Sequence, residues 1–171
     1  STSKSISEMS KIVTINFVCL GNICRSPLAQ GVFQDLLNRE KLDQKIFVSS
    51  SGTGGWHIGN LPDERMRQTA KSKGIILESR AQQFQSNDFN RFNLILAMDH
   101  SNLARLSEIA PGNLLPGQLM LFRSFDPKDS GDKDVPDPYY GGSKGFEEVY
   151  SMVERTCPQI LVYIKSHFLN L

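Results

Sequence analysis

The amino-acid sequence predicts an α/β fold, in which a four-stranded parallel sheet carries helices on both faces in a Rossmann-like three-layer sandwich. Short β-rich segments alternate with segments of helical periodicity along the 171 residues. Strands that alternate with helices usually pair in parallel and are covered on both faces. Ligands of such sheets bind beyond the carboxyl ends of the strands, and Cys19 stands at the end of the first strand.

Four segments have the composition of strands. Residues 12–18 form a mostly apolar, β-branched run, which is typical of a strand buried on both faces. Residues 46–50, residues 93–98 and residues 118–122 are the other three.

Start and stop signals predict the first two helices. Ser26 can cap the first helix, and Pro27 then occupies the first helical position, which favours proline. The second helix begins at the acidic, proline-led residues 62–64 and ends before Gly74, with lysines in its last turn.

The rest of the chain predicts two more helices around a long loop. Residues 100–109 form the third helix, and residues 124–145 are a loop rich in Asp, Pro, Gly and Lys. Residues 146–168 place apolar side chains at helical spacing. Pro158 falls inside this last segment, so we expect it to kink or restart the helix.

Length and composition exclude several classes of protein. We assign residues 11–171 to a single domain and the Ser-rich residues 1–10 to a flexible N-terminal tail that lacks the apolar stretch of a secretory signal. The formal charge of +1 excludes a polycation that binds nucleic acid, and no apolar run reaches the length of a membrane span. Three cysteines are too few for a disulfide scaffold and favour a reducing, cytoplasmic setting.

The segment between the first strand and the first helix has the chemistry of an anion-binding loop. Cys19 and Arg25 are separated by five residues, and such a loop can curl so that its N–H groups and the helix N-terminus point at one centre. Gly21 and Asn22 tolerate the left-handed backbone angles that this requires. Arg25 can bind two phosphate oxygens. The same positive surroundings favour the thiolate form of Cys19, and Ser26 can donate a hydrogen bond to that thiolate.

Two other interpretations compete for this loop. A buried cysteine at a strand end beside an unrelated arginine has the same spacing, but the Gly-Asn pair and the Ser-Pro helix start favour the functional interpretation. A nucleotide-binding P-loop requires Gly-Lys-Ser/Thr, which does not occur in the sequence.

A second short segment supplies a candidate general acid. Asp137 is flanked by Pro136 and Pro138, which stiffen the backbone and fix the direction of the carboxylate. Tyr139 and Tyr140 follow and offer flat walls for an aromatic substrate. On its own this segment is more typical of an ordinary turn. Beside a nucleophilic cysteine it predicts the acid that protonates a leaving phenolate.

The two segments, Cys-Leu-Gly-Asn-Ile-Cys-Arg-Ser-Pro at residues 19–27 and Asp-Pro-Tyr-Tyr at residues 137–140, resemble the low-molecular-weight protein-tyrosine phosphatases. The resemblance implies a phosphotyrosine phosphatase I-like sandwich and hydrolysis of phosphotyrosine proteins or small aryl phosphates through a phosphocysteine intermediate. Asp137 first protonates the phenolate and then activates water. The resemblance further implies no metal or other cofactor, inhibition by phosphate-like oxyanions, and a monomer or weak dimer.

The resemblance also implies which residues contact the substrate. Trp56 corresponds to a variable loop beside the pocket, although a lone tryptophan can also plug the edge of a core. The full set implied to bind substrate is Leu20, Gly21, Asn22, Ile23, Cys24, Ser26, Trp56, Tyr139 and Tyr140.

Residues behind the pocket follow from the same resemblance. Asp99 lies in a Met-Asp-x-Ser-Asn segment and is expected to support the active site, to cap the third helix, or both. Asn22 and Ser51 match residues that brace the loop. The chain departs from the family at Ser79, where many members have a histidine of this brace.

The remaining cysteines and histidines are less informative. By resemblance, Cys24 can form a reversible disulfide with Cys19 under oxidants; alternatively it is a small buried apolar residue. Cys157 lies in the last helix and is expected to pack there. The three histidines lack ligand spacing, so we expect no zinc site.

Two other functions were weighed against phosphatase activity. An arsenate reductase with the same loop passes oxidation to two further thiols, and residues 80–95 contain none. A binding module that has lost catalysis is expected to lack the cysteine or the acid, and this chain has both.

Overall fold

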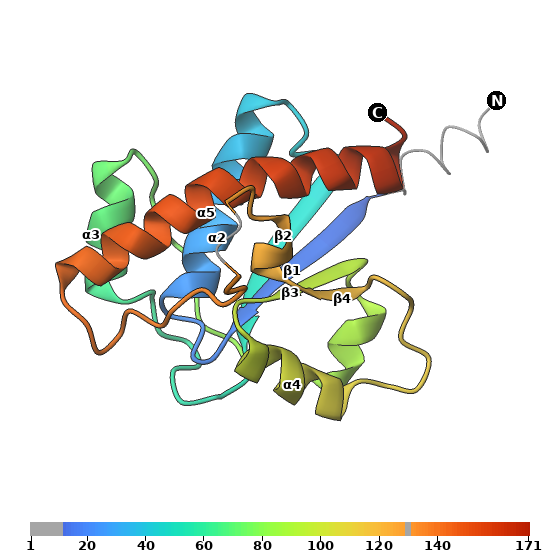
Figure 1. Ribbon diagram of the computed structural model, residues 1–171, viewed down its shortest axis with the longest axis horizontal. Coiled ribbons are helices and arrows are strands. Elements are labelled where there is room, and N and C mark those ends of the chain that lie inside the picture. The colour runs from blue at the N-terminus through green and yellow to red at the C-terminus, as the bar shows by residue number, and fades with distance from the viewer. Residues whose placement is uncertain (1–11, 129–130) are drawn as a thin grey trace.

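The computed structural model describes residues 12–128 and 131–171, so the predicted N-terminal tail lies outside the described residues. A four-stranded sheet in the order β2-β1-β3-β4 forms the centre, and each neighbouring pair is parallel (Figure 1). The predicted fold class is therefore confirmed. The strands are β1 (Val13–Cys19), β2 (Ile46–Gly52), β3 (Leu94–Ala97) and β4 (Leu119–Leu121).

Helices cover both faces of this sheet. The first face carries α2 (Arg25–Arg39), α3 (Glu64–Ser72) and α5 (Ser143–Ile164), which contact one another and share one apolar core with β1. The second face carries α4 (His100–Ile109) and the short 3₁₀ helix η1 (Ser86–Asn90), which close a second, smaller core. The sequence did not predict η1.

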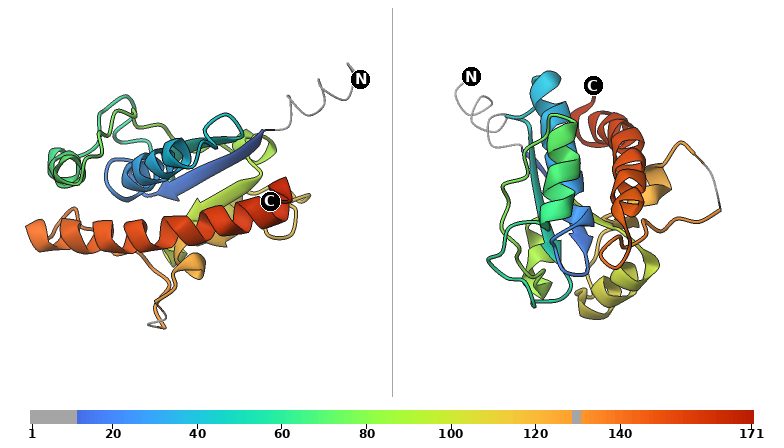
Figure 2. Two further views of the ribbon diagram at one scale, coloured as in Figure 1. Left: turned by 90° about the horizontal axis from the view of Figure 1, so that it is seen from above. Right: turned by 90° about the vertical axis from the view of Figure 1, so that its left-hand side faces the viewer.

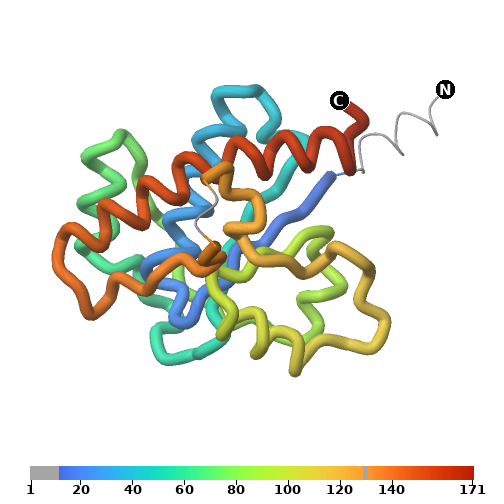
Figure 3. The backbone as a smooth tube through the Cα atoms, viewed as in Figure 1, coloured from blue at the N-terminus to red at the C-terminus, as the bar shows by residue number. Residues whose placement is uncertain are grey.

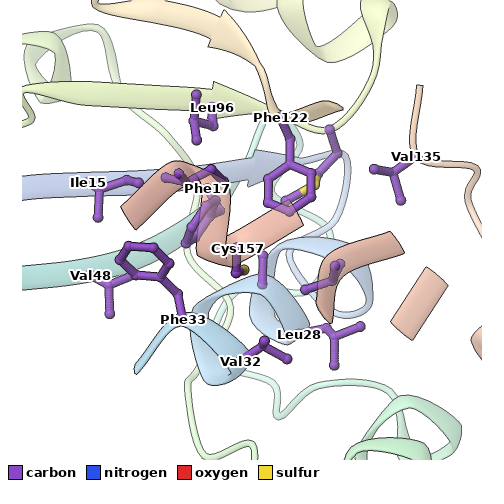
Figure 4. Close-up of a cluster of buried hydrophobic side chains, with 14 of the residues drawn as sticks. Ile15, Phe17, Leu28, Val32, Phe33, Val48, Leu96, Phe122, Val135 and Cys157 are labelled. Carbon is purple, nitrogen blue, oxygen red and sulfur yellow. The ribbon is translucent and has the colours of Figure 1, made fainter. Parts of the chain in front are cut away.

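Phe17 of β1 lies at the centre of the main core. Its ring meets the edges of Phe33 on α2 and Phe122, at centroid separations of 5.8 and 5.7 Å (Figure 4). All three side chains are fully buried, and each contributes up to about 3 kcal/mol by leaving water. The core thus fixes the direction of β1, and with it the position of the residue that follows.

Strand register brings three chain segments to one edge of the sheet. Val18 pairs with Ser51 of β2 on one side and with Ala97 of β3 on the other. Cys19, which ends β1, pairs with Gly52. The ends of β1, β2 and β3 therefore meet at one place, as parallel topology requires.

The predicted start of the first helix is wrong. Helix α2 begins at Arg25, and the preceding Cys24 makes no side-chain capping bond. Ser26 is therefore inside the helix, where its hydroxyl bonds to Cys19 and Asn22 instead of capping the backbone. Pro27 becomes the third helical residue, a position whose N–H still lacks an intrahelical partner.

The sequence predicted a kink or a restart at Pro158, and the restart is wrong. Helix α5 runs without interruption from Ser143 to Ile164 (Figure 2). Proline inside a helix costs about 3 kcal/mol, but the nearby Cys157 and Ile160 are fully buried in the core. Their burial offsets the lost hydrogen bond. The chain then ends in a π-helical turn, Lys165–Leu169.

Candidate active site

The loop after β1 curls around the sulfur of Cys19. Asn22 has a φ of 58°, in the left-handed region expected for it, and its backbone N–H points at Cys19 Sγ from 3.3 Å. Gly52 lies against this loop, where a Cβ would stand 2.7 Å from Leu20 O. Only a glycine at the end of β2 leaves room for so close an approach.

Ser26 contacts the same sulfur from the helix side. Its Oγ lies 2.9 Å from Cys19 Sγ and accepts a hydrogen bond from Asn22 Nδ2 at 2.8 Å. The single hydroxyl hydrogen is thus free to be donated, either to the sulfur or to the more distant Ser51 O at 3.3 Å. A donor at 2.9 Å stabilises a thiolate.

Asn22 is the centre of a wider network. Its Nδ2 also donates to Ser50 Oγ, and its Oδ1 accepts from the backbone N–H of Gln82, both at 3.0 Å. Ser50 in turn donates to Gln30 Oε1 at 2.6 Å. Ser51, which the sequence analysis named as the brace, takes part through its carbonyl oxygen.

The residues that sequence reasoning missed here are Ser50, Gln30 and Gln82. Gln30 lies one helical turn after Ser26, among the buried Ala29 and Val32. A polar residue on the buried face of a helix is a signal that could have identified it. The sequence gives no local signal for Gln82, because it donates to Asn22 through its backbone N–H, which almost any residue type could supply.

Arg25 is buried and contacts three residues from two other segments of the chain. Its Nη1 donates to Asp99 Oδ2 at 2.7 Å and to Val135 O at 3.0 Å, and its Nη2 lies 3.6 Å from Asp137 Oδ2. Burial acts to lower the pKa of Arg25, but Cys19 and Asp99 outweigh burial, and the pKa rises. Arg25 therefore remains a cation beside the sulfur.

Asp99 has both of the roles expected of it. One carboxylate oxygen accepts from the backbone N–H of Asn102 at 2.7 Å and caps α4, while the other holds Arg25. One side chain thus joins the helix N-terminus to the guanidinium.

Asp137 lies beside the loop of Cys19, although 118 positions separate the two residues (137 − 19). The loop that carries it passes next to the loop after β1 (Figure 3). Its Oδ1 accepts from the N–H of Tyr139 at 3.0 Å, which leaves Oδ2 toward Arg25. The side chain is 36% exposed, so it can exchange protons with bound substrate or water.

A cavity of about 390 Å³ opens above this loop. Trp56 is 72% exposed, so it forms part of the rim and does not plug the core. Cys19, Arg25, Asn22 and Ser26 are buried behind the wall. The lining residues are Leu20, Gly21, Ile23, Cys24, Trp56, His57, Asp137, Tyr139 and Tyr140.

Aromatic rings and one arginine shape the rim. The rings of Tyr139 and Tyr140 meet edge to face, with centroids 5.0 Å apart. The guanidinium of Arg65 lies 5.3 Å from the Tyr139 ring centroid and is held by Asp63 at 2.9 Å. Sequence analysis missed Arg65 and His57, because neither is part of a recognisable motif.

All three cysteines are free thiols, and all are buried. Burial raises the pKa of Cys24, and the nearby charges of Asp63, Cys19 and Asp137 raise it further. Burial also raises the pKa of Cys157. Both groups are therefore neutral thiols and weak nucleophiles at neutral pH.

Over residues 12–128 and 131–171, no group of three or more His, Cys, Asp or Glu side chains is arranged to hold a metal ion. None of the helices within these ranges has the length and apolarity needed to cross a bilayer.

Known proteins resemble this chain along most of its length. The sequence profile of the low molecular weight phosphotyrosine protein phosphatases matches residues 14–168. The low molecular weight protein-tyrosine-phosphatase of Streptomyces coelicolor is 42% identical over 150 residues, which cover 87% of this chain and 92% of that protein. A protein tyrosine phosphatase from Entamoeba histolytica has a TM-score of 0.86 at 35% identity, over 90% of this chain and 97% of its own.

A third relative was solved with a ligand. Wzb of Vibrio vulnificus, in complex with benzylphosphonate, has a TM-score of 0.73 at 30% identity and covers 86% of this chain and 95% of its own. Sequence and structure thus agree, and a cysteine at the end of the first strand fits the nucleophile that these enzymes require. The chain belongs to the low molecular weight phosphotyrosine protein phosphatase family, a group of phosphoric monoester hydrolases.

Proposed function

We propose that the protein hydrolyses phosphotyrosine and small aryl phosphates in two steps, with Cys19 as nucleophile, Arg25 as phosphate clamp and Asp137 as general acid and base. One observation carries this proposal: the backbone N–H of Asn22 and the hydroxyl of Ser26 both lie within 3.3 Å of the sulfur of Cys19. A guanidinium and a carboxylate at the same loop complete the set.

In the first step the thiolate attacks phosphorus. The S–P bond forms, the P–O bond to the aryl group breaks, and Asp137 gives its proton to the leaving phenolate oxygen. Arg25 and the N–H groups of residues 20–24 neutralise the phosphoryl oxygens as charge develops.

In the second step water attacks the phosphocysteine. The carboxylate of Asp137 takes a proton from water, the new P–O bond forms, and the S–P bond breaks. The sulfur leaves as a thiolate, which the hydroxyl of Ser26 and the N–H of Asn22 stabilise. Phosphate and the starting thiolate are the products.

The cavity favours an aromatic ester. Trp56, Tyr139 and Tyr140 offer flat apolar surfaces, and Asp137 is the one carboxylate among the lining residues. Benzylphosphonate, the ligand in the Wzb complex, combines a phenyl ring with a tetrahedral phosphorus group. Phosphate-like oxyanions, which occupy the same loop, are expected to inhibit.

The setting of the protein follows from its thiols. The mechanism requires a reduced Cys19, which is consistent with a cytoplasmic location. Formation of a disulfide between Cys19 and Cys24 under oxidants is part of the proposal, and the protonated state of Cys24 makes it slow.

Hydrolysis of 4-nitrophenyl phosphate in EDTA tests this function. Cys19→Ser is expected to lose turnover completely, because a hydroxyl in this loop is not deprotonated. Cys157→Ser is the matched control, since its thiol is buried in the core on α5. Activity that survives Cys19→Ser, or that disappears in EDTA and returns with a divalent metal, would contradict the mechanism.

A further inference from the structure

The loop that carries Asp137 is joined to the body of the protein at Val135. This residue is fully buried, and its N–H donates to Met98 O at 2.8 Å, just beyond the end of β3. Its carbonyl accepts from Arg25 Nη1 at 3.0 Å. The backbone two residues before the proposed acid is therefore bonded to both the sheet and the phosphate clamp.

Asp134 adds a second attachment through both of its acceptor groups. Its Oδ1 accepts from the backbone N–H of His100 at 2.8 Å and lies 2.6 Å from His100 Nδ1. Its carbonyl oxygen accepts from Arg123 Nη1 at 2.7 Å. One residue thus joins the loop to the start of α4 and to a buried arginine.

Arg123 is itself held rigidly. Its Nε donates to Asp126 Oδ2 at 2.9 Å, and Asp126 also accepts two bonds from Arg155 of α5. Burial acts to raise the pKa of Asp126, but the bonds from Arg155, the Lys128 N–H and Arg123 lower it to about 2. The carboxylate is charged at neutral pH and fixes the guanidinium that reaches Asp134.

By contrast, the contacts of Asp137 do little to fix its own position. Its Oδ1 bonds within the same loop, to the Tyr139 N–H, and its Oδ2 lies 3.6 Å from Arg25. Pro136 holds its φ angle near −65°, and Val135 is fixed by its own hydrogen bonds, so the short segment between Asp134 and Asp137 is stiff. A stiff segment transmits the position of its attached end to its free end.

We propose that Arg123 and Asp134 are positioning residues that set where the carboxyl group of Asp137 meets the leaving oxygen. The inference rests on the proposed role of Asp137 as general acid. Loosening the attachment at Asp134 leaves the nucleophile and the clamp in place but moves the acid away from the phenolate.

A displaced acid has a specific kinetic signature. The value of kcat/KM reports the steps up to release of the phenol. Without protonation, a poor leaving group such as phenol suffers more than a good one such as 4-nitrophenol. A displacement of about 1 Å can cost up to about 10²-fold in rate. We expect the ratio of kcat/KM for 4-nitrophenyl phosphate to that for phenyl phosphate to rise about tenfold.

The experiment compares four variants, together with Asp137→Ala, with wild type by this ratio. Arg123→Met and Asp134→Ala are expected to raise it. Asp134→Asn keeps an oxygen that accepts from the His100 N–H, so its ratio is expected to lie close to that of wild type. Arg105→Met is the control, since it loses an arginine ion pair, to Glu108 on α4, that touches neither Arg123 nor the loop. Thermal melts establish which variants fold, and the inhibition constant of inorganic phosphate shows that the clamp is intact.

The outcomes separate this inference from the proposed function. Asp137→Ala must itself raise the ratio; if it does not, the assignment of the acid fails. If Asp137→Ala raises the ratio while folded Arg123→Met and Asp134→Ala do not, the positioning role is overturned. An equal rise in Arg105→Met also overturns it, because the effect is then not specific to the attachment at Asp134. Asp134→Ala decides the question alone if Arg123→Met does not fold, because the side chain of Asp134 is 40% exposed and tolerates truncation.

Discussion

The close approach of β2 to the phosphate loop predicts that Gly52→Ala disables the enzyme. The added Cβ would stand 2.7 Å from Leu20 O, 3.0 Å from Asn22 N and 3.0 Å from Gly21 C. All three are backbone atoms of the loop, so no side chain can rotate away. Overpacking of this kind costs about 1–3 kcal/mol. To relieve these clashes the loop must move by a few tenths of an ångström to about 1 Å. Such a displacement would lower kcat/KM by up to about 10²-fold.

Steady-state hydrolysis of 4-nitrophenyl phosphate and a thermal melt measure both effects. For a chain of this size each kcal/mol lowers Tm by about 2–4 °C. Gly112→Ala is the matched control, because a Cβ there meets no atom within 4 Å and its φ is not positive. A Gly52→Ala enzyme with kcat/KM within twofold of wild type would refute the argument that loop geometry depends on this glycine.

Two more predictions concern Ser26 and Asp126. Ser26→Ala removes a hydrogen bond to the departing sulfur, worth about 1.5–3 kcal/mol when the partner is charged. Hydrolysis of the phosphoenzyme should slow about 10- to 150-fold, so that rapid-quench kinetics show a burst of phenol before a slow steady state; an unchanged kcat would contradict this. Asp126, held by Arg123 and Arg155, has its folded pKa lowered from 3.8 to about 2. Its contribution of about 2 kcal/mol is present above pH 4 and lost as pH falls toward 2. The difference in unfolding free energy between wild type and Asp126→Asn in urea melts should therefore shrink over this interval, and a constant difference would refute it.

The fold and the nucleophilic loop could be predicted because their signals are contiguous in sequence. The apolar run of β1, the loop of residues 19–25 and the start of α2 occupy one short stretch, and each part restricts the next. The start of α2 was placed two residues late, at Pro27 in place of Arg25, because Ser26 is a good capping residue by type. Its hydroxyl is used by Cys19 and Asn22, and this competition depends on tertiary contacts.

The bracing network could be predicted only in part, because it relies on backbone groups and on strand register. The carbonyl of Ser51 and the N–H of Gln82 reach the loop, and any residue type other than proline supplies such groups. Gln30 joins the bracing network because the hydroxyl of Ser50 points toward α2 and donates to its side chain. Ser79, which the family comparison marked as a departure, takes no recorded part in these bonds, so this chain braces Asn22 without a histidine at that position.

The placement of Asp137 depends least on its own sequence neighbourhood. Its motif explains the stiffness of the segment and the carboxylate, but not why a residue 118 positions after the nucleophile (137 − 19) lies beside it. That follows from β3, which lies next to β1 and ends at the same edge of the sheet. Beyond that edge, Met98 O accepts from the N–H of Val135, and Arg25 donates to the carbonyl of Val135. The guanidinium that would bind phosphate therefore also holds the loop of the proposed acid, which couples substrate binding to acid position through one side chain.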